Sequence, residues 1–144
     1  MKPRYKTARC ILYRDDRYLL AVHNRYWHRA EQRWGLPGGQ IEWGESPATA
    51  VARELEEELQ IYVPDLMELG AWPYKRAMHM VFAAPLDEDI QDYDDVELLD
   101  IGWFTEAEVA GLKSRTALHA DYELEAIRRL RARLAGDVQV LAAG

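Results

Sequence analysis

Three glutamates of this chain, Glu54, Glu57 and Glu58, are spaced so that their side chains could do chemistry together. Residues at i, i+3 and i+4 share one face of a helix, so these carboxylates would converge over a single turn. Neighbouring like charges destabilise an exposed helix by about 0.2–0.5 kcal/mol per pair. A hard divalent cation, Mg²⁺ or Mn²⁺, prefers oxygen ligands and would turn this repulsion into attraction. The alternative interpretation is a solvated acidic helix face.

The helix that must carry these glutamates is expected to begin at Pro47. Ser46 is suited to cap it, and proline is tolerated at the first helical position because its missing N–H would have no partner there. Apolar residues then recur at intervals of three and four, which predicts a face that packs on a sheet. These residues are Ala48, Val51, Ala52, Leu55 and Leu59.

A longer pattern surrounds this helix. Gly39 is followed after five residues by Glu45 and, after seven more, by the run Arg53–Ile61. This spacing resembles the Nudix box, the signature of the Nudix hydrolases. One position departs, because Gln60 stands where the family has a glycine just past the helix end. A glycine there supplies a left-handed cap, and another residue in that conformation costs on the order of 1 kcal/mol. The departure therefore concerns the geometry of the helix end more than the chemistry.

The order of predicted elements favours an α/β/α sandwich with a mixed β-sheet, and the resemblance implies the Nudix fold. A short helix is expected from the capping box at residues 105–108 to about Gly111, and a final helix from about Asp121. Length and a hydrophobic content of 49% favour a single domain over residues 1–144. Strands are expected at residues 7–13 and 17–23, which would form a hairpin, and at residues 66–72 and 76–84.

The acidity of the chain is local. The net charge is −7, and residues 42–58 alone hold six glutamates and one arginine. No basic stripe of the kind that binds nucleic acid polymers or anionic membranes appears elsewhere, so a nucleotide-derived small molecule is the expected partner. A single cysteine, Cys10, and the lack of an apolar leader favour the cytoplasm. A monomer and a homodimer are both compatible with the sequence.

The resemblance implies a reaction and a set of residues for it. In this family, water attacks a phosphorus of the pyrophosphate in a nucleoside diphosphate derivative and releases a nucleoside monophosphate or a related product. The implied cofactor is Mg²⁺ or Mn²⁺, held by the three glutamates and by the carbonyl of Gly39. Glu54 is also a candidate general base. Glu97 is its rival, because many Nudix enzymes have an acidic residue at such a position on a loop facing the metal.

Arg53 and Glu45 are expected to support the carboxylates. Arg53 would orient them through charge-assisted hydrogen bonds, and Glu45 would brace the loop against Arg53 or the helix end. For Arg53 this structural role is preferred to direct contact with substrate.

Residues 24–33 read as a long polar, basic and aromatic loop, and they are the second place where substrate contacts are expected. Aromatic side chains there could stack on a nucleobase, and arginines could pair with phosphate oxygens. The alternative interpretation is that these aromatic side chains only anchor the loop to the core. The substrate-binding candidates are Arg25, Tyr26, Trp27 and Arg33, with Arg29 as a further arginine, and Lys75 and Arg76 at the start of a later strand.

For three other side chains, a structural role and a role in binding ligand were both considered. His23 lies where a strand meets the loop, so a surface imidazole is favoured over ligand contact. His79 is expected to be a core histidine rather than a ligand, and Trp34 to serve packing rather than recognition.

Two other functions compete with hydrolysis. A non-catalytic Nudix-fold module could sense nucleotides or bind partners, and an acidic adaptor could bind protein without metal. Such sensing modules can lose box carboxylates, whereas this chain retains all of them. A distortion of the helix end at Gln60 would favour the sensing module. The identity of the nucleoside diphosphate derivative does not follow from the sequence.

Overall fold

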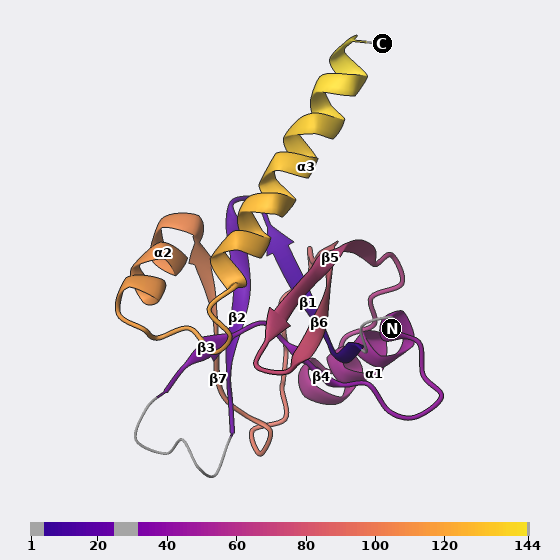
Figure 1. Ribbon diagram of the computed structural model, residues 1–144, viewed down its shortest axis with the longest axis vertical. Helices are drawn as coiled ribbons and strands as arrows, with labels where there is room; N and C mark the ends of the chain where they lie inside the picture. The colour runs from indigo at the N-terminus through magenta and orange to yellow at the C-terminus, as the bar shows by residue number, and fades with distance from the viewer. Residues whose placement is uncertain (1–4, 25–31, 144) are drawn as a thin grey trace.

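The computed structural model describes the backbone of residues 5–24 and 32–143, with side chains as far as residue 136. A mixed sheet lies between helix α1 on one face and helices α2 and α3 on the other (Figure 1), which confirms the predicted α/β/α sandwich. The elements in chain order are β1 (Tyr5–Arg14), β2 (Arg17–His23), β3 (Trp34–Gly35), β4 (Gly38–Gln40), α1 (Pro47–Leu59), β5 (Met67–Tyr74), β6 (Ala77–Pro85), β7 (Leu98–Thr105), α2 (Glu106–Ser114) and α3 (Glu123–Ala143).

Strand β1 organises the sheet. It runs parallel to β6, with Arg9 opposite Val81, and every other pairing is antiparallel among the strands that the structure describes. It pairs with β2 only near their shared turn, at Tyr13 and Arg14. Farther along, β4 pairs with β1 instead, which sets Gly38 opposite Arg9 and Gly39 opposite Ala8. The glycine turn is thereby brought beside the middle of the sheet.

Two apolar clusters fill the sandwich, one on each face of the sheet. The cluster under α1 contains Val51, Leu55 and Leu59, as the helical pattern predicts. The prediction for Ala48 was wrong, because that residue is exposed and Ala50 is buried in its place. Cys10 is fully buried in this cluster, and burial raises the pKa of its thiol, as expected of a core residue rather than a nucleophile.

The other predicted elements are confirmed with shifted ends. The hairpin of β1 and β2, the β5–β6 pair and the capped start of α2 are all present. Helix α2 continues to Ser114, beyond the expected end near Gly111. Strands β3, β4 and β7 were not predicted. The first two are only two and three residues long, and β7 has a single buried residue, Leu98, so it lacks the alternation that marks a half-buried strand.

No helix within the described ranges is long and apolar enough to cross a membrane.

Candidate functional site

Helix α1 has well-formed ends. The Ser46 side chain accepts a hydrogen bond from the Thr49 amide at 3.2 Å, and Pro47 opens the first turn. At the other end Gln60 takes the left-handed conformation, with φ 55° and ψ 41°, and its amide donates to the Glu56 carbonyl at 3.0 Å. Gln60 thus provides the cap that a glycine would usually provide. The helix continues undistorted through Glu57 and Glu58.

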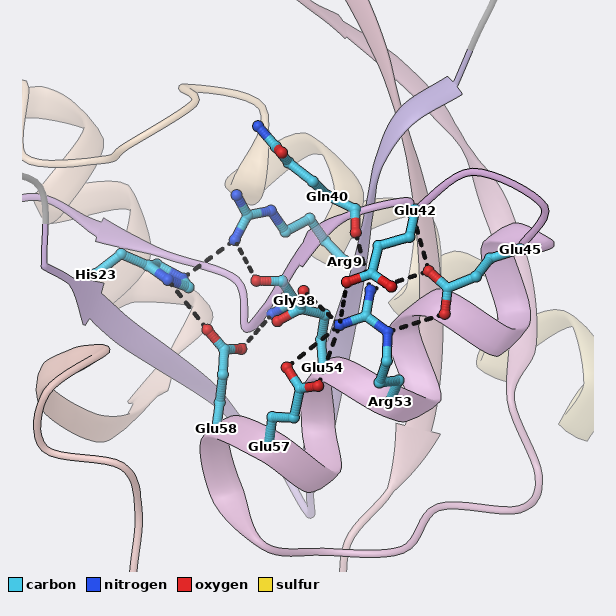
Figure 2. A network of polar contacts seen from close by, with 10 residues as sticks. All are labelled: Arg9, His23, Gly38, Gln40, Glu42, Glu45, Arg53, Glu54, Glu57 and Glu58. Atoms are coloured by element: carbon cyan, nitrogen blue, oxygen red, sulfur yellow. Dashed lines mark hydrogen bonds and ion pairs between the residues drawn. The ribbon is translucent and has the colours of Figure 1, made fainter.

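Arg53 lies at the centre of an ion-pair network (Figure 2). Its Nε and Nη2 donate to the two carboxylate oxygens of Glu45 at 2.8 and 2.9 Å. Its Nη1 donates to Glu54 at 3.2 Å and to Glu57 at 3.2 Å. The Glu45 pKa is lowered, mainly because the carboxylate accepts hydrogen bonds from Arg53. The guanidinium therefore holds two candidate ligands in place while Glu45 holds the guanidinium.

Glu54 lies directly against the glycine turn. A Cβ atom built on Gly39 would stand 2.6 Å from the Glu54 carboxylate carbon, so the carboxylate would have to move from its present position if Gly39 carried a side chain. The side chain is half-buried, and its pKa is raised, first by burial and then by the negative charge of Glu58. The carboxylates therefore crowd one another in a partly desolvated place.

Glu58 is buried, with 4% of its surface exposed. Its Oε1 accepts a hydrogen bond from the Gly38 amide at 2.9 Å, and its Oε2 lies 3.4 Å from Nδ1 of His23. Of the three glutamates, Glu57 alone is exposed. A fully solvated acidic face is therefore the wrong description of this helix surface, because two of its carboxylates have lost much of their water.

The chemistry of these groups fits a hard cation. No three His, Cys, Asp or Glu side chains within the described part of the chain already converge as a formed metal site. The donors nevertheless consist of carboxylate and backbone oxygens, which Mg²⁺ and Mn²⁺ prefer. The turn at Gly39 leaves space for Glu54, and a cation would offset the negative charge of Glu58 that adds to the effect of burial in raising the Glu54 pKa.

The loop that carries Glu97 is attached to the end of α1. The Asp94 amide donates to the Glu58 carbonyl at 2.9 Å, and the Asn24 amide donates to the Glu97 carbonyl at 2.8 Å. Leu98, the next residue, pairs with His23 at the end of β2. The structure thus brings the backbone of Glu97 to the same end of the sheet as Glu58, and its side chain is exposed.

The candidate substrate-binding residues fall into three groups. Arg25, Tyr26, Trp27 and Arg29 lie outside the described residues. Arg33 is half-buried just before β3. Lys75 and Arg76 form the exposed turn between β5 and β6, where the Lys75 ammonium lies 5.3 Å from the centre of the Tyr74 ring.

Sequence reasoning missed Arg9 and misjudged His23. Arg9 is 5% exposed, and its Nη1 lies 3.1 Å from Nε2 of His23. The one available signal was a charged residue inside an otherwise apolar strand. His23 was expected on the surface, but only 10% of its side chain is exposed, because Leu36, Arg9 and Glu58 surround the ring.

His79 is a buried core histidine as predicted, with Nδ1 2.7 Å from the Tyr122 hydroxyl, and Trp34 packs edge-on against Phe104.

Comparisons with known proteins identify the family of this chain. A family model described as NUDIX domain matches residues 3–126. NAD-capped RNA hydrolase NudC of Mycobacterium tuberculosis is 37% identical over 112 residues, which cover 74% of this chain and 35% of that protein. The same enzyme of Pectobacterium atrosepticum is 36% identical over 110 residues, covering 72% of this chain and 41% of that protein. This chain thus spans well under half the length of these curated relatives.

Solved structures give the same result at the level of fold. The crystal structure of the MutT NUDIX hydrolase from Burkholderia pseudomallei is 27% identical, with a TM-score of 0.64 over 75% of this chain and 87% of that one. The NUDIX domain of Shewanella oneidensis NrtR, solved with ADP ribose, is 24% identical, with a TM-score of 0.70 over 93% of this chain and 90% of that one.

Proposed function

The chain belongs to the Nudix hydrolase family, and on that premise we propose that it hydrolyses a nucleoside diphosphate derivative. Water would attack a phosphorus of the pyrophosphate, and a nucleoside monophosphate or a related product would leave. The observation that carries this proposal is the placement of Glu54 and Glu58 against the Gly38–Gly39 backbone, two carboxylates withdrawn from water beside a third.

Nudix hydrolases generally need a divalent metal ion, and we propose Mg²⁺ or Mn²⁺ here. Glu54, Glu57, Glu58 and the carbonyl of Gly39 would hold it. When bound, the ion would neutralise charge on the phosphate oxygens and lower the pKa of the attacking water.

The protein's own side chains would orient the metal-binding carboxylates and remove a proton from the attacking water. Arg53, held by both oxygens of Glu45, would keep the carboxylates of Glu54 and Glu57 turned toward the substrate. Glu54 is the proposed general base, since its carboxylate lies against Gly39 beside the other ligands. Glu97 is the alternative base, supported by the attachment of its loop to the end of α1.

The substrate is proposed to be a nucleotide-derived small molecule. Arg25, Arg33, Lys75 and Arg76 would contact phosphates, and Tyr26 and Trp27 would stack on the base. The relatives named for NAD-capped RNA make the capped end of an RNA a second kind of substrate to test. ADP ribose belongs in the same test because the NrtR domain was solved with it.

Further proposals concern the domain organisation, cellular location and oligomeric state of the protein. We propose one domain for residues 1–144, since the family model alone spans residues 3–126. We propose the cytoplasm as its location, because a buried free thiol at Cys10 suits a reducing compartment. A monomer and a homodimer remain the two proposed states, to be separated by analytical ultracentrifugation.

The decisive experiment measures hydrolysis of a substrate panel with Mg²⁺, with Mn²⁺ and with chelator. The panel contains ADP ribose, nucleotide sugars, dinucleoside polyphosphates, nucleoside triphosphates, NAD and a short NAD-capped RNA. We expect metal-dependent turnover of at least one class. A wild-type protein inactive on the whole panel would favour the nucleotide-sensing module instead, although the undistorted cap at Gln60 gives that module no support.

Variants in α1 test the residue assignment. Glu57→Gln and Glu58→Gln should each lower kcat by at least about 100-fold, because each removes a charged oxygen ligand. Glu56→Gln is the matched control, since Glu56 is an exposed glutamate of the same helix outside the proposed ligand set, and it should stay within about twofold of wild type. Equal rates in all three variants would show that the ligand assignment is wrong.

A further inference from the structure

A buried arginine contacts the turn that precedes the proposed metal ligand Gly39. Arg9 is 5% exposed in the middle of β1. A buried guanidinium is costly unless its N–H groups find acceptors. Within the described residues these acceptors are two backbone carbonyls and an imidazole, all reached by Nη1: Gly38 O at 3.0 Å, Leu36 O at 3.1 Å and His23 Nε2 at 3.1 Å.

These contacts hold the turn that precedes Gly39. The carbonyls of Leu36, Pro37 and Gly38 all accept from β1, the first and third from Arg9 and the second from the Cys10 amide at 3.0 Å. Gly38 approaches β1 so closely that a Cβ atom would stand 2.2 Å from the Ala8 carbonyl oxygen. Three consecutive peptides of the turn are therefore fixed to one strand, and Arg9 supplies two of the three bonds.

The same arginine lies beside the ring of His23, which in turn faces Glu58 (Figure 2). Nε2 of His23 lies 3.1 Å from Nη1 of Arg9 and 3.1 Å from the Leu36 carbonyl oxygen, so this edge of the ring is fixed between the strand and the turn. Nδ1, on the other side of the ring, faces Oε2 of Glu58 at 3.4 Å. Arg9 and the Leu36 carbonyl thus hold the imidazole in the orientation in which it meets this carboxylate.

The contacts form a closed ring around Glu58. Gly38 accepts a hydrogen bond from Arg9 at its carbonyl oxygen and donates one to Glu58 Oε1 from its amide. His23 approaches the other oxygen, Oε2. Each carboxylate oxygen has two lone pairs, so one on each remains for a cation. Residues of β1, β2 and the glycine turn therefore hold the Glu58 carboxylate in one orientation.

We propose that Arg9 and His23 are positioning residues that hold the Gly38–Gly39 backbone and the Glu58 carboxylate in the arrangement that binds the divalent ion. This inference rests on the proposed function. Neither side chain is assigned to contact the substrate or the ion. Their effect is to pre-organise ligands, and loss of such supporting hydrogen bonds typically costs about 10–100-fold in metal affinity or activity.

The test uses the full chain and Mn²⁺ alone as the probe. The variants are Arg9→Lys, Arg9→Met and His23→Phe, the last of which keeps a ring beside His119 but removes both nitrogens. Arg14→Met is the matched control, because Arg14 lies in the same strand and also donates to a carbonyl, that of Leu86 at 3.0 Å, while its ion pair is with Asp89 and not with a glutamate of α1. Electron paramagnetic resonance gives the Mn²⁺ dissociation constant, steady-state kinetics give kcat and KM, and thermal melts report folding.

We expect Arg9→Met and His23→Phe to weaken Mn²⁺ binding about 10–100-fold and to lower kcat similarly at subsaturating metal, with KM for nucleotide changed less than about threefold. Arg9→Lys should recover part of the loss, since an ammonium keeps the charge and some of the bonds. Arg14→Met should bind Mn²⁺ like wild type. The double variant Arg9→Lys/His23→Phe should lose less than the product of the two single-variant losses, because the two residues act in part on the same carboxylate.

Other outcomes have definite meanings. If Arg9→Met does not fold, Arg9→Lys and His23→Phe decide the question. Folded variants that melt earlier but bind Mn²⁺ and turn over substrate like Arg14→Met would overturn the positioning role and leave Arg9 as a support of the fold. A wild-type protein that neither binds Mn²⁺ nor hydrolyses the panel would instead overturn the proposed function, and this inference with it.

Discussion

Glu123 is the most deeply buried carboxylate that the structure describes, with 1% of its surface exposed. Its Oε2 accepts a hydrogen bond from the Ala120 amide at 2.9 Å, whereas Oε1 has no hydrogen-bond partner among the described residues. Burial raises the pKa of Glu123, and the hydrogen bond from the Ala120 amide, followed by the positive charge of Arg9, opposes this rise only in part. At the scale of single residues, this is the clearest place where the protein tolerates an unfavourable charge.

The direction of the Glu123 pKa predicts a pH dependence of stability. Because the pKa is higher in the folded than in the unfolded chain, the carboxyl's contribution to stability is fully present below the unfolded pKa of about 4.3 and is lost as pH rises through the folded pKa. Glu123→Gln cannot titrate. We therefore expect the melting temperature of wild type to fall relative to that of Glu123→Gln as pH rises from about 4.5 to 8.

The control for this prediction is Glu125→Gln, an exposed glutamate two residues along the same helix. Thermal melts of both variants and wild type across that pH range supply the measurement. A difference between wild type and Glu123→Gln that does not change with pH would show that folding does not raise the pKa of this carboxyl.

At the scale of elements, helix α1 depends on its two ends. The cap at Ser46 follows the common pattern, but the cap at Gln60 places a residue with a side chain at φ 55°. Left-handed backbone costs a residue with a Cβ roughly 1–2 kcal/mol, and glycine avoids that cost at the expense of a more flexible unfolded chain. The chain therefore carries a mild strain directly beside Glu57 and Glu58.

Gln60→Gly should relieve this strain. We expect the free energy of unfolding, measured by urea denaturation, to rise by about 0.5–1 kcal/mol, with hydrolysis unchanged because the helix already ends correctly. Glu56→Gly, a glycine at an exposed interior position of the same helix, should have the opposite sign and destabilise by about 1 kcal/mol. A loss of stability in Gln60→Gly would mean that the Gln60 side chain makes a favourable contact outweighing the backbone strain.

For the whole molecule, the relevant feature is where its negative charge lies. Six of the 25 acidic residues lie within residues 42–58, on helix α1 and the loop that precedes it. An ion that binds there only in the folded state stabilises the whole fold by mass action, by about 2.7 kcal/mol at a concentration of 100 times the dissociation constant. Metal binding and global stability are therefore coupled.

We accordingly predict that Mg²⁺ or Mn²⁺ raises the melting temperature of wild type and raises that of Glu58→Gln much less. NaCl at matched ionic strength is the control, because general screening would relieve the repulsion in both proteins alike. Differential scanning fluorimetry over a metal titration is sufficient. An equal shift of wild type and Glu58→Gln would mean that the ions act by screening rather than at this site.

Several features followed from the sequence by itself. The start of α1, the face that carries Val51, Leu55 and Leu59, the β1–β2 hairpin and the cap of α2 depend on residues only a few positions apart. Such local patterns determine periodicity and capping whatever the rest of the chain does. The spacing of the Nudix box is local in the same sense, so the family could be identified before the fold.

Only the tertiary structure decided what surrounds those carboxylates. Arg9, His23 and Glu58 lie in β1, β2 and α1, and they meet because β4 pairs with β1 and brings Gly38 between them. Strands β3, β4 and β7 are too short or too exposed to leave a pattern, yet their pairing determines which side chains converge. Contacts between residues distant in sequence depend on sheet register, and strands as short as β3 and β4 have too few residues for a hydrophobic pattern to specify it.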